Sequence, residues 1–296
     1  MFEVSTRVAD AHEDSIWSVA WSAASNKIVT GSVDEAVKVW SPEDKTTAEK
    51  KFEGHQWGVI SVAVNPAGNL VASSSLDSNI KLWDMDKGTL LRTIDASPVE
   101  TWSIAFSPDG KFIASGSKSG NINIWSVETG EKAQTLEPNG KFAMSVAYSP
   151  NGRFVACGAM DGVVTIFDLQ EGKRLHSIEG HAMAVRSLTF SQDSLLLLTA
   201  SDDMHVNLYD VERADMISSV SGHSSWVLSV AYSPDSKYFA TGSSDKTVKI
   251  WDTQSKECVH TFAEHNDQVW GVAFSPKGNE LASVSADRYL NFYKLA

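Results

Sequence analysis

The fold is decided by one stretch of the chain. It reads Glu53-Gly54-His55, followed by apolar runs at 59–64 and 70–75, then Ile80-Lys81-Leu82-Trp83-Asp84 and a last run at 90–94. Apolar and polar residues alternate in Ile80-Lys81-Leu82, which is the period of two that a β-strand requires. The stretch therefore predicts four short strands.

The same pattern recurs at an almost constant spacing along the whole chain. An aromatic residue closes each copy, and successive aromatics are 43, 42, 42, 42, 42 and 42 residues apart: Trp40, Trp83, Trp125, Phe167, Tyr209, Trp251 and Tyr293. A repeat of this length ending in Trp-Asp is typical of β-propeller blades. We predict an all-β fold, a seven-bladed β-propeller with four-stranded antiparallel blades, in which residues 1–296 form a single domain.

Composition excludes several classes of partner. The chain has 25 Lys and Arg against 37 Asp and Glu, so its net charge is −12 and it repels phosphate backbones and anionic membranes. No apolar run approaches the roughly 18–20 residues that span a bilayer, and residues 1–11 lack the apolar core of a signal peptide. The two cysteines, Cys157 and Cys258, lie far apart and predict neither a disulfide nor a zinc site. We expect a soluble intracellular protein that binds neither nucleic acid nor membranes directly.

The spacing of Gly-His, Asp and Trp-Asp resembles the WD-repeat propeller family over the whole chain. An Asp follows the His by 22 residues in all five copies that keep both residues: His12/Asp34, His55/Asp77, His181/Asp203, His223/Asp245 and His265/Asp287. The resemblance implies that the His, the Asp, a Ser or Thr four residues before the Asp, and the Trp form a hydrogen-bonded tetrad inside each blade. Copies one, two and six match in full: His12, Thr30, Asp34 and Trp40; His55, Ser73, Asp77 and Trp83; His223, Thr241, Asp245 and Trp251.

His, Asp and Ser or Thr together also invite a comparison with hydrolase triads, which are judged by geometry and role. Five repeated sets are too many for one active site, whereas a buried polar network that locks a blade is needed repeatedly. The sequence also lacks Gly-x-Ser-x-Gly, a P-loop and a dinucleotide fingerprint. We therefore expect a protein that is not an enzyme and has no catalytic, cofactor or metal site.

The two ends of the chain complement each other. After Tyr293 only three residues remain, too few for the outer strand of the last blade. A strand-like segment, Phe2-Glu3-Val4-Ser5-Thr6-Arg7-Val8, precedes the first copy. We predict that this N-terminal strand pairs into the last blade and closes the ring, because an open edge would invite aggregation.

One position varies between copies in a way that suggests binding. The residue five after the His position is expected to precede the first strand and to lie at the mouth of the central channel: Trp17, Ile60, Trp102, Met144, Arg186, Leu228 and Trp270. Phe142 and Trp226 lie two residues before this position. Trp and Arg are enriched at binding hot spots. We predict a protein-binding site for a short peptide with an apolar anchor, with Arg186 pairing a carboxylate or carbonyl of the ligand; the alternative is that these side chains only fill the channel.

Longer segments resemble the small metazoan WD-repeat subunits of the superkiller complex, among them Ala11-His12-Glu13-Asp14-Ser15-Ile16-Trp17 and Asp267-Gln268-Val269-Trp270. The resemblance implies a monomeric scaffold within hetero-complexes. It would join a tetratricopeptide scaffold and a helicase that assist the exosome in 3′-to-5′ mRNA decay, and in the nucleus it would belong to the Paf transcription-elongation complex. It implies localisation in nucleus and cytoplasm. A substrate receptor of a ubiquitin ligase and a histone-tail reader are the competing interpretations.

Copies three and four depart from the tetrad pattern and give a first testable prediction. Copy three has Ser97 and Ser119 in place of His and Asp, and copy four has Asn139 and Cys157 in place of His and the hydroxyl residue. Fewer buried hydrogen bonds lower the free energy of local opening. Amide hydrogen exchange should therefore be fastest in the strands of these two blades, and uniform protection of all seven blades would contradict this.

Overall fold

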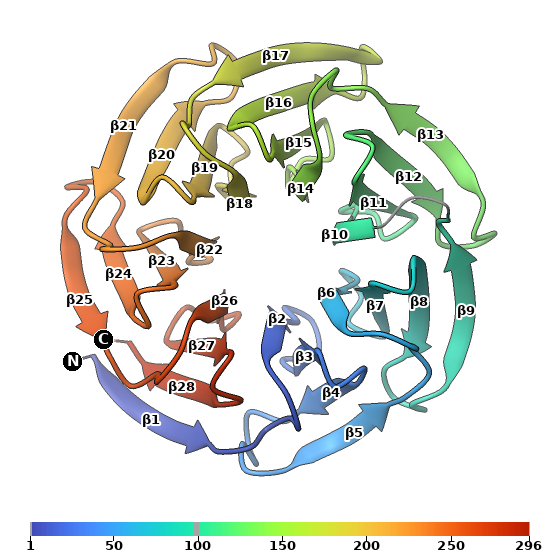
Figure 1. Cartoon of the computed structure of the whole chain (residues 1–296), viewed down its shortest axis with the longest axis vertical. Coiled ribbons are helices and arrows are strands. Elements are labelled where there is room, and N and C mark those ends of the chain that lie inside the picture. Colours follow the sequence, from blue (N-terminus) through green and yellow to red (C-terminus); the bar gives the residue numbers. More distant parts are fainter. Residues whose placement is uncertain (1, 98–100, 296) are drawn as a thin grey trace.

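The computed structural model describes residues 2–97 and 101–295, and within these ranges the backbone forms only strands, turns and connecting loops. The strands make seven four-stranded antiparallel sheets arranged as blades around a central axis (Figure 1). The predicted seven-bladed propeller is therefore confirmed. None of the described residues lies in a helix long and apolar enough to cross a membrane.

Each blade runs from an innermost to an outermost strand. Blade one contains β2 (Ile16–Trp21), β3 (Ile28–Ser32), β4 (Val37–Trp40) and β5 (Ala48–Phe52), and blade two contains β6 (Val59–Val64), β7 (Leu70–Ser75), β8 (Asn79–Asp84) and β9 (Leu90–Asp95). Blade three contains β10 (Thr101–Phe106), β11 (Phe112–Ser117), β12 (Ile122–Ser126) and β13 (Lys132–Leu136), and blade four contains β14 (Ala143–Tyr148), β15 (Phe154–Ala159), β16 (Val163–Asp168) and β17 (Lys173–Glu179). Blade five contains β18 (Val185–Phe190), β19 (Leu196–Ser201), β20 (His205–Asp210) and β21 (Met216–Ser221), and blade six contains β22 (Val227–Tyr232), β23 (Tyr238–Ser243), β24 (Val248–Asp252) and β25 (Cys258–Phe262). Blade seven contains β26 (Val269–Phe274), β27 (Glu280–Ser285), β28 (Leu290–Lys294) and, as its outer strand, β1 (Glu3–Val8).

The core lies between neighbouring blades. Val29 and Val39 of blade one pack with Val59, Val71 and Trp83 of blade two in one buried cluster. An isolated four-stranded sheet exposes both faces to water, so each blade depends on its neighbours for burial. The ring must therefore be complete for every blade to be covered.

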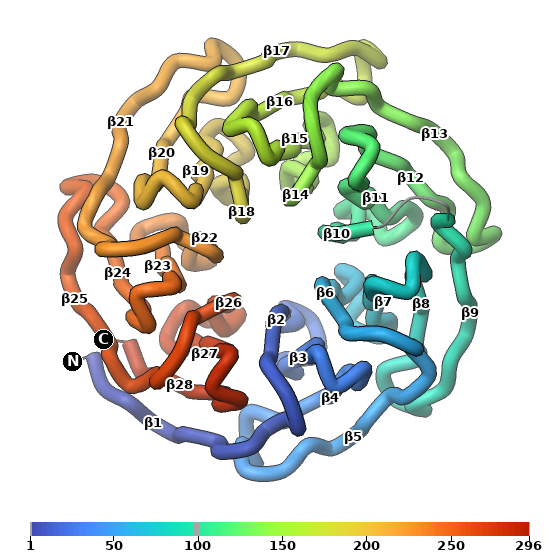
Figure 2. Tube along the Cα trace, in the orientation of Figure 1, coloured from blue at the N-terminus to red at the C-terminus, as the bar shows by residue number. Residues whose placement is uncertain are grey.

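The ring is closed by β1, as predicted. β1 runs antiparallel to β28, with Val4 opposite Tyr293 and Val8 opposite Leu290. The two termini lie side by side at this point (Figure 2). Phe2 stacks on His260 of blade six with ring centroids 5.2 Å apart, so the N-terminal segment is held by two blades.

A second contact reinforces the junction between the last and first blades. The connection between β4 and β5 carries Lys45, whose ammonium pairs with Glu280 of β27 and lies over the ring of Phe292 of β28. Both side chains of the ion pair are largely shielded from solvent. Blade seven is thus tied to blade one by side chains as well as by the backbone that continues from β1 into β2.

Removing the closing strand should destabilise the whole ring. Deletion of residues 1–9 would expose the edge of β28 and uncover Leu290 and Phe292, which are fully buried in the intact protein. We expect the melting temperature to fall by about 10 °C or more, the loss of several kcal/mol in a domain of this size. Thermal unfolding followed by circular dichroism measures this, and an unchanged melting temperature would contradict the closure.

Candidate functional site

Two sets of residues repeat around the ring. One is a set of hydrogen-bonded polar and aromatic residues inside the blades, and the other is a mostly apolar set that lines the channel. The inner set of blade two joins His55, Ser73, Asp77 and Trp83. His55 Nδ1 lies 2.9 Å from Asp77 Oδ2, His55 Nε2 lies 2.8 Å from Ser73 Oγ, and Trp83 Nε1 donates to Ser73 Oγ at 2.9 Å. All four side chains are thereby joined in one chain of hydrogen bonds.

Chemistry fixes the direction of this chain. An indole N–H can only donate and an ionised carboxylate can only accept, so Trp83 donates to Ser73, Ser73 donates to the imidazole Nε2, and Nδ1–H donates to Asp77. A neutral histidine with its proton on Nδ1 satisfies every group. The carboxylate oxygen of Asp77 also accepts the backbone N–H of Gln56 at 3.0 Å, which fixes the loop that leads into β6.

Blades one and six have the same network. His12 lies 2.9 Å from Asp34 and 2.7 Å from Thr30, to which Trp40 donates at 2.9 Å. In blade six the distances from His223 to Asp245 and Thr241 are 2.8 and 2.6 Å, and Trp251 donates to Thr241 at 2.9 Å. All twelve residues predicted to form tetrads are therefore joined by hydrogen bonds, in three sets of four.

The electrostatics agree with a neutral imidazole beside an ionised carboxylate. Burial lowers the pKa of His12 below its usual value, although Asp34 opposes this effect. Burial alone would raise the pKa of Asp34, but the hydrogen bonds from His12 and from the backbone of Glu13 and Ala36 outweigh it and hold that pKa at about 2. At neutral pH the network therefore keeps one negative charge, which is fully hydrogen-bonded.

Tyrosine completes the network in blades five and seven, which the sequence pattern did not reveal. In blade seven, Ser283 Oγ lies 2.7 Å from His265 Nε2 and 2.9 Å from the hydroxyl of Tyr293. In blade five, His181 bonds Asp203 at 2.8 Å and Thr199 at 2.7 Å, with the hydroxyl of Tyr209 beside them. A phenol can both donate and accept, so it replaces the indole without leaving an unpaired group.

Blades three and four have incomplete networks. Trp125 still donates to Ser115 at 2.9 Å, and Ser117 and Ser119 share a 2.8 Å hydrogen bond, but Ser97 supplies no imidazole. In blade four Cys157 is buried, and burial raises the pKa of its thiol to about 12, so it stays a neutral, weak hydrogen-bonding group.

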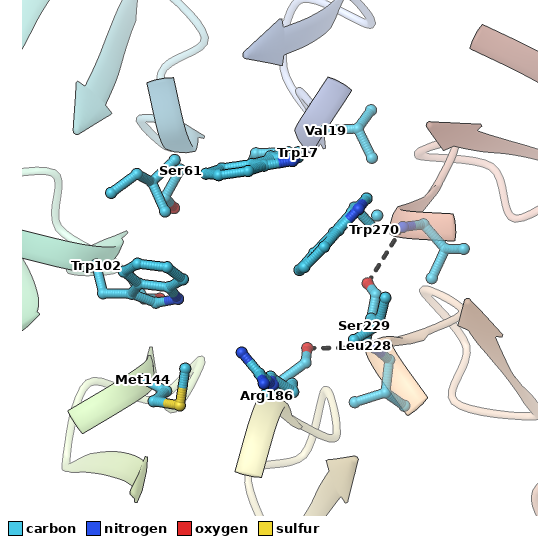
Figure 3. A pocket seen from close by; sticks show the side chains of 16 residues that line it. Trp17, Val19, Ser61, Trp102, Met144, Arg186, Leu228, Ser229 and Trp270 are labelled. Atoms are coloured by element: carbon cyan, nitrogen blue, oxygen red, sulfur yellow. Dashed lines mark hydrogen bonds between the residues drawn. The ribbon is translucent and has the colours of Figure 1, made fainter. Parts of the chain in front are cut away.

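The second set of residues lines the central channel. Trp17, Ile60, Trp102, Met144, Arg186, Leu228 and Trp270 surround one cavity of about 230 Å³ (Figure 3). The prediction that they precede the first strand is wrong, because each is the second residue of the innermost strand of its blade. The strand pairing skips each of them, as between Ile16 and Ser18 or between Val269 and Gly271. A β-bulge leaves such a residue unpaired and re-aims its side chain.

These seven side chains differ in exposure. Ile60, Met144 and Leu228 are only 7%, 5% and 4% exposed, so they fill the wall of the channel. Trp17, Trp102 and Trp270 are half-buried.

The three indoles form one group at the channel. The ring centroid of Trp17 lies 5.6 Å from that of Trp270 and 6.5 Å from that of Trp102. The three tryptophans thus present a connected aromatic surface. The aliphatic residues of the set are buried in the channel wall, as expected if they only fill the channel.

The guanidinium of Arg186 is already held by a carboxylate of the protein. Its Nε and Nη2 atoms donate to both carboxylate oxygens of Asp202 at 2.7–3.0 Å, and its guanidinium lies 5.7 Å from the ring of Trp226. The predicted role of Arg186 in pairing a ligand stays a prediction, because the pair with Asp202 uses only Nε and Nη2 of the five-donor guanidinium. A fork-shaped pair of this kind fixes geometry, so Arg186 orients the rim.

An exposed apolar arc extends the channel mouth over blades three to six. Phe142 meets Trp102 edge to face with ring centroids 5.4 Å apart, and Met160 donates its backbone N–H to the carbonyl of Phe142 at 2.9 Å. Trp226 is 43% exposed, and Met160 and Met183 are exposed as well. Apolar groups recur around one mouth of the channel, which is the composition expected of an interaction surface.

A serine follows each channel residue in the first six blades, and this signal was missed in the sequence. Ser18, Ser61, Ser103, Ser187 and Ser229 each accept the backbone N–H of the innermost strand of the next blade at 3.0–3.4 Å. Ser145 instead donates to the carbonyl of Val185 at 3.1 Å. Blade seven has Gly271, where a Cβ would lie only 2.9 Å from Val19 Cγ1. The spacing of 42 to 43 residues between the serines could have revealed this ladder.

Comparison with known families agrees with this geometry. A family model described as the IFT122 first beta-propeller matches residues 4–185, and the model of the WD domain, G-beta repeat, matches residues 172–210, 215–252 and 256–294. The chain belongs to the WD-repeat β-propeller family. WD-repeat propellers are generally interaction scaffolds without catalytic activity.

No group of three or more His, Cys, Asp or Glu side chains that could hold a metal ion occurs among residues 2–97 and 101–295. Of the histidines in this part of the chain, the five in blade positions are each bonded to an Asp and to a Ser or Thr. These histidines therefore have structural partners on both ring nitrogens.

The tetrad gives a prediction that compares two serines at equivalent positions. Ser73→Ala removes the hydroxyl that links His55 to Trp83 and leaves two buried groups unpaired, whereas Ser115→Ala leaves only the Trp125 N–H unpaired. At roughly 1–3 kcal/mol for each orphaned group, Ser73→Ala should cost about twice as much as Ser115→Ala. Urea unfolding of both variants measures the difference, and equal losses would argue against the network.

Proposed function

We propose that this propeller is a non-catalytic scaffold that binds protein partners through the channel mouth. The observation that carries the proposal is the group of three half-buried indoles, Trp17, Trp102 and Trp270, held at β-bulges of a rigid ring. Large aromatic side chains bury much area at little cost in conformational entropy, so they favour a binding role. A rigid ring presents them in a preorganised arrangement.

The chemistry of the mouth favours an apolar anchor on the partner. Arg186 is already paired with Asp202, and the apolar residues that continue the mouth are the half-buried Phe142 and the exposed Met160 and Trp226. A short peptide segment that inserts one apolar side chain between the indoles would bury the most surface. The net charge of −12 also favours a protein ligand over nucleic acid.

The proposed assemblies follow from the sequence resemblance to the WD-repeat subunits of the superkiller complex. In the cytoplasm the chain would join a tetratricopeptide scaffold and a helicase that feed the exosome in 3′-to-5′ mRNA decay. In the nucleus it would be a subunit of the Paf transcription-elongation complex. In both places it would act as a monomeric propeller within a hetero-complex, with the apolar mouth as the contact.

Affinity purification tests this proposal. The tagged chain should recover a tetratricopeptide protein and a helicase from cell extract, and Paf subunits from nuclear extract. Trp17→Ala and Trp270→Ala should each weaken partner binding by about 2 kcal/mol or more, because truncating a hot-spot residue has that effect. Both variants should keep the fold, since these half-buried side chains face the channel cavity rather than the core between the blades.

Trp21 supplies a matched control. It is half-buried like the channel tryptophans, but it lies at the other end of β2 from Trp17 and does not line the channel. Trp21→Ala should retain the partners, which separates loss of the mouth from loss of any half-buried indole. Retained binding by both Trp17→Ala and Trp270→Ala would overturn the proposal that the channel mouth binds partners. Recovery of cullin components or histone tails instead would overturn the proposed assemblies.

A further inference from the structure

A groove between blades three and four belongs neither to the channel nor to the tetrads. Its volume is about 470 Å³, and it shares no lining residue with the channel mouth. Phe112 and Ile124 of blade three and Tyr148 and Leu169 of blade four form its apolar wall. Asp109 is the one charged side chain among the residues that line it.

Two other junctions show how such a groove can be filled. Arg92 of the outer strand β9 crosses from blade two to blade three and donates to the carbonyls of Glu128 and Thr129 at 2.7 and 2.8 Å. These carbonyls belong to the turn between β12 and β13. In the same way, His176 of β17 lies 2.7 Å from the carbonyl of Glu212 in the turn of blade five. A basic side chain of one blade thus caps the turn of the next.

Strand register identifies Gln134 as the equivalent residue of blade three. Arg92 pairs with Leu82, His176 with Ile166 and Gln134 with Ile124, so the three occupy the same place in their sheets. Gln134 and its neighbour Ala133 are both exposed. The shorter glutamine has no hydrogen bond to the turn of blade four within the part of the chain that the structure describes.

The turn glycines confirm that this junction is open. A Cβ placed on Gly130 would lie 2.8 Å from Arg92 Cδ, and one placed on Gly88 would lie 3.5 Å from Lys50 Cδ. A Cβ placed on the equivalent Gly172 of blade four would meet no atom within 4 Å beyond its chain neighbours. Blade five also has a short residue at this position, Ser218, but its hydroxyl oxygen is buried, so that junction is covered.

We propose that the groove between blades three and four is a docking site for an extended segment of a protein partner that carries an arginine. The arginine takes the place that Arg92 occupies one blade earlier. Its methylene stem covers Phe112 and Tyr148, and its guanidinium donates to the turn carbonyls of Gln170 and Glu171, the counterparts of Glu128 and Thr129. The repeat itself therefore specifies the missing group.

Charge and topology favour the same occupant. Asp109 gives the groove a negative charge that complements a guanidinium. β13 is the outer strand of its sheet, so its edge is open to an extended backbone. Blades three and four also lack full tetrads, so fewer tetrad hydrogen bonds oppose local adjustment on binding.

A synthetic peptide with the sequence Leu-Leu-Arg-Thr-Ile, copied from residues 90–94, is the probe. Added at up to about 5 mM to the full ¹⁵N-labelled chain, it should shift the amide signals of β13 and of residues 169–172, with a dissociation constant of the order of a millimolar. The same peptide with Gln in place of Arg should bind at least tenfold more weakly. Equal shifts from both peptides, or no shift at these amides, would overturn the proposal.

Variants of the full chain give the matched controls. Gln134→Arg supplies the guanidinium from the protein's own chain. It should weaken binding of the peptide at least tenfold, and the melting temperature should stay unchanged or rise. Lys132→Arg lies on the same strand outside the groove lining and should not change binding. Trp270→Ala should not change it either, which keeps this site separate from the channel mouth. Sedimentation that shows a dimer lost in Gln134→Arg would assign the groove to a second copy and overturn the proposal.

Discussion

The pairing of β1 with β28 is the interaction on which the rest of the ring depends. Every blade buries its faces against its two neighbours, so a gap at one junction would expose both blades beside it. Side-chain contacts hold the closed blade to both of its neighbours. On the side of blade six, Phe2 stacks on His260 and Arg7 donates to the carbonyl of Glu264, and on the side of blade one, Lys45 pairs with Glu280. The serine ladder is interrupted at the same place by Gly271, so closure relies on β1 and on these side chains.

Within the closed ring, the two repeated sets of residues have different tasks. The tetrads are buried and satisfy nearly all of their hydrogen-bonding groups internally, so they stabilise each blade and have little capacity left for a ligand. The bulge residues of the innermost strands point into the channel, where Trp17, Trp102 and Trp270 remain half-exposed. A bulge releases a residue from the constraints of pairing, so its identity can vary from blade to blade without harm to the sheet.

Sequence periodicity was sufficient to predict the blades, their number and the closing strand, because strand alternation and turn residues act locally and the repeat multiplies them. It also located the seven channel residues, although it placed them before the strand. The β-bulge at each channel residue was not predicted, because a bulge depends on the register between two strands. The pairing of Arg186 with Asp202 was not predicted, because Asp202 lies 16 residues away in the turn after β19 and only the fold brings the two side chains to 2.7 Å. Tyr209 and Tyr293 did not fit a tryptophan pattern, yet their hydroxyls reach the same hydrogen-bonding network.

The central claim is that partners contact the tryptophans of the channel mouth while the tetrads and outer strands only support them. Hydroxyl-radical footprinting of the free chain and of its native complex measures this directly, because tryptophan oxidation reports the solvent exposure of each indole. Trp17, Trp102 and Trp270 should become protected in the complex, while Trp21 at the other end of β2 keeps its oxidation rate. Unchanged oxidation of the three channel tryptophans in a complex that protects Trp21 would contradict the claim.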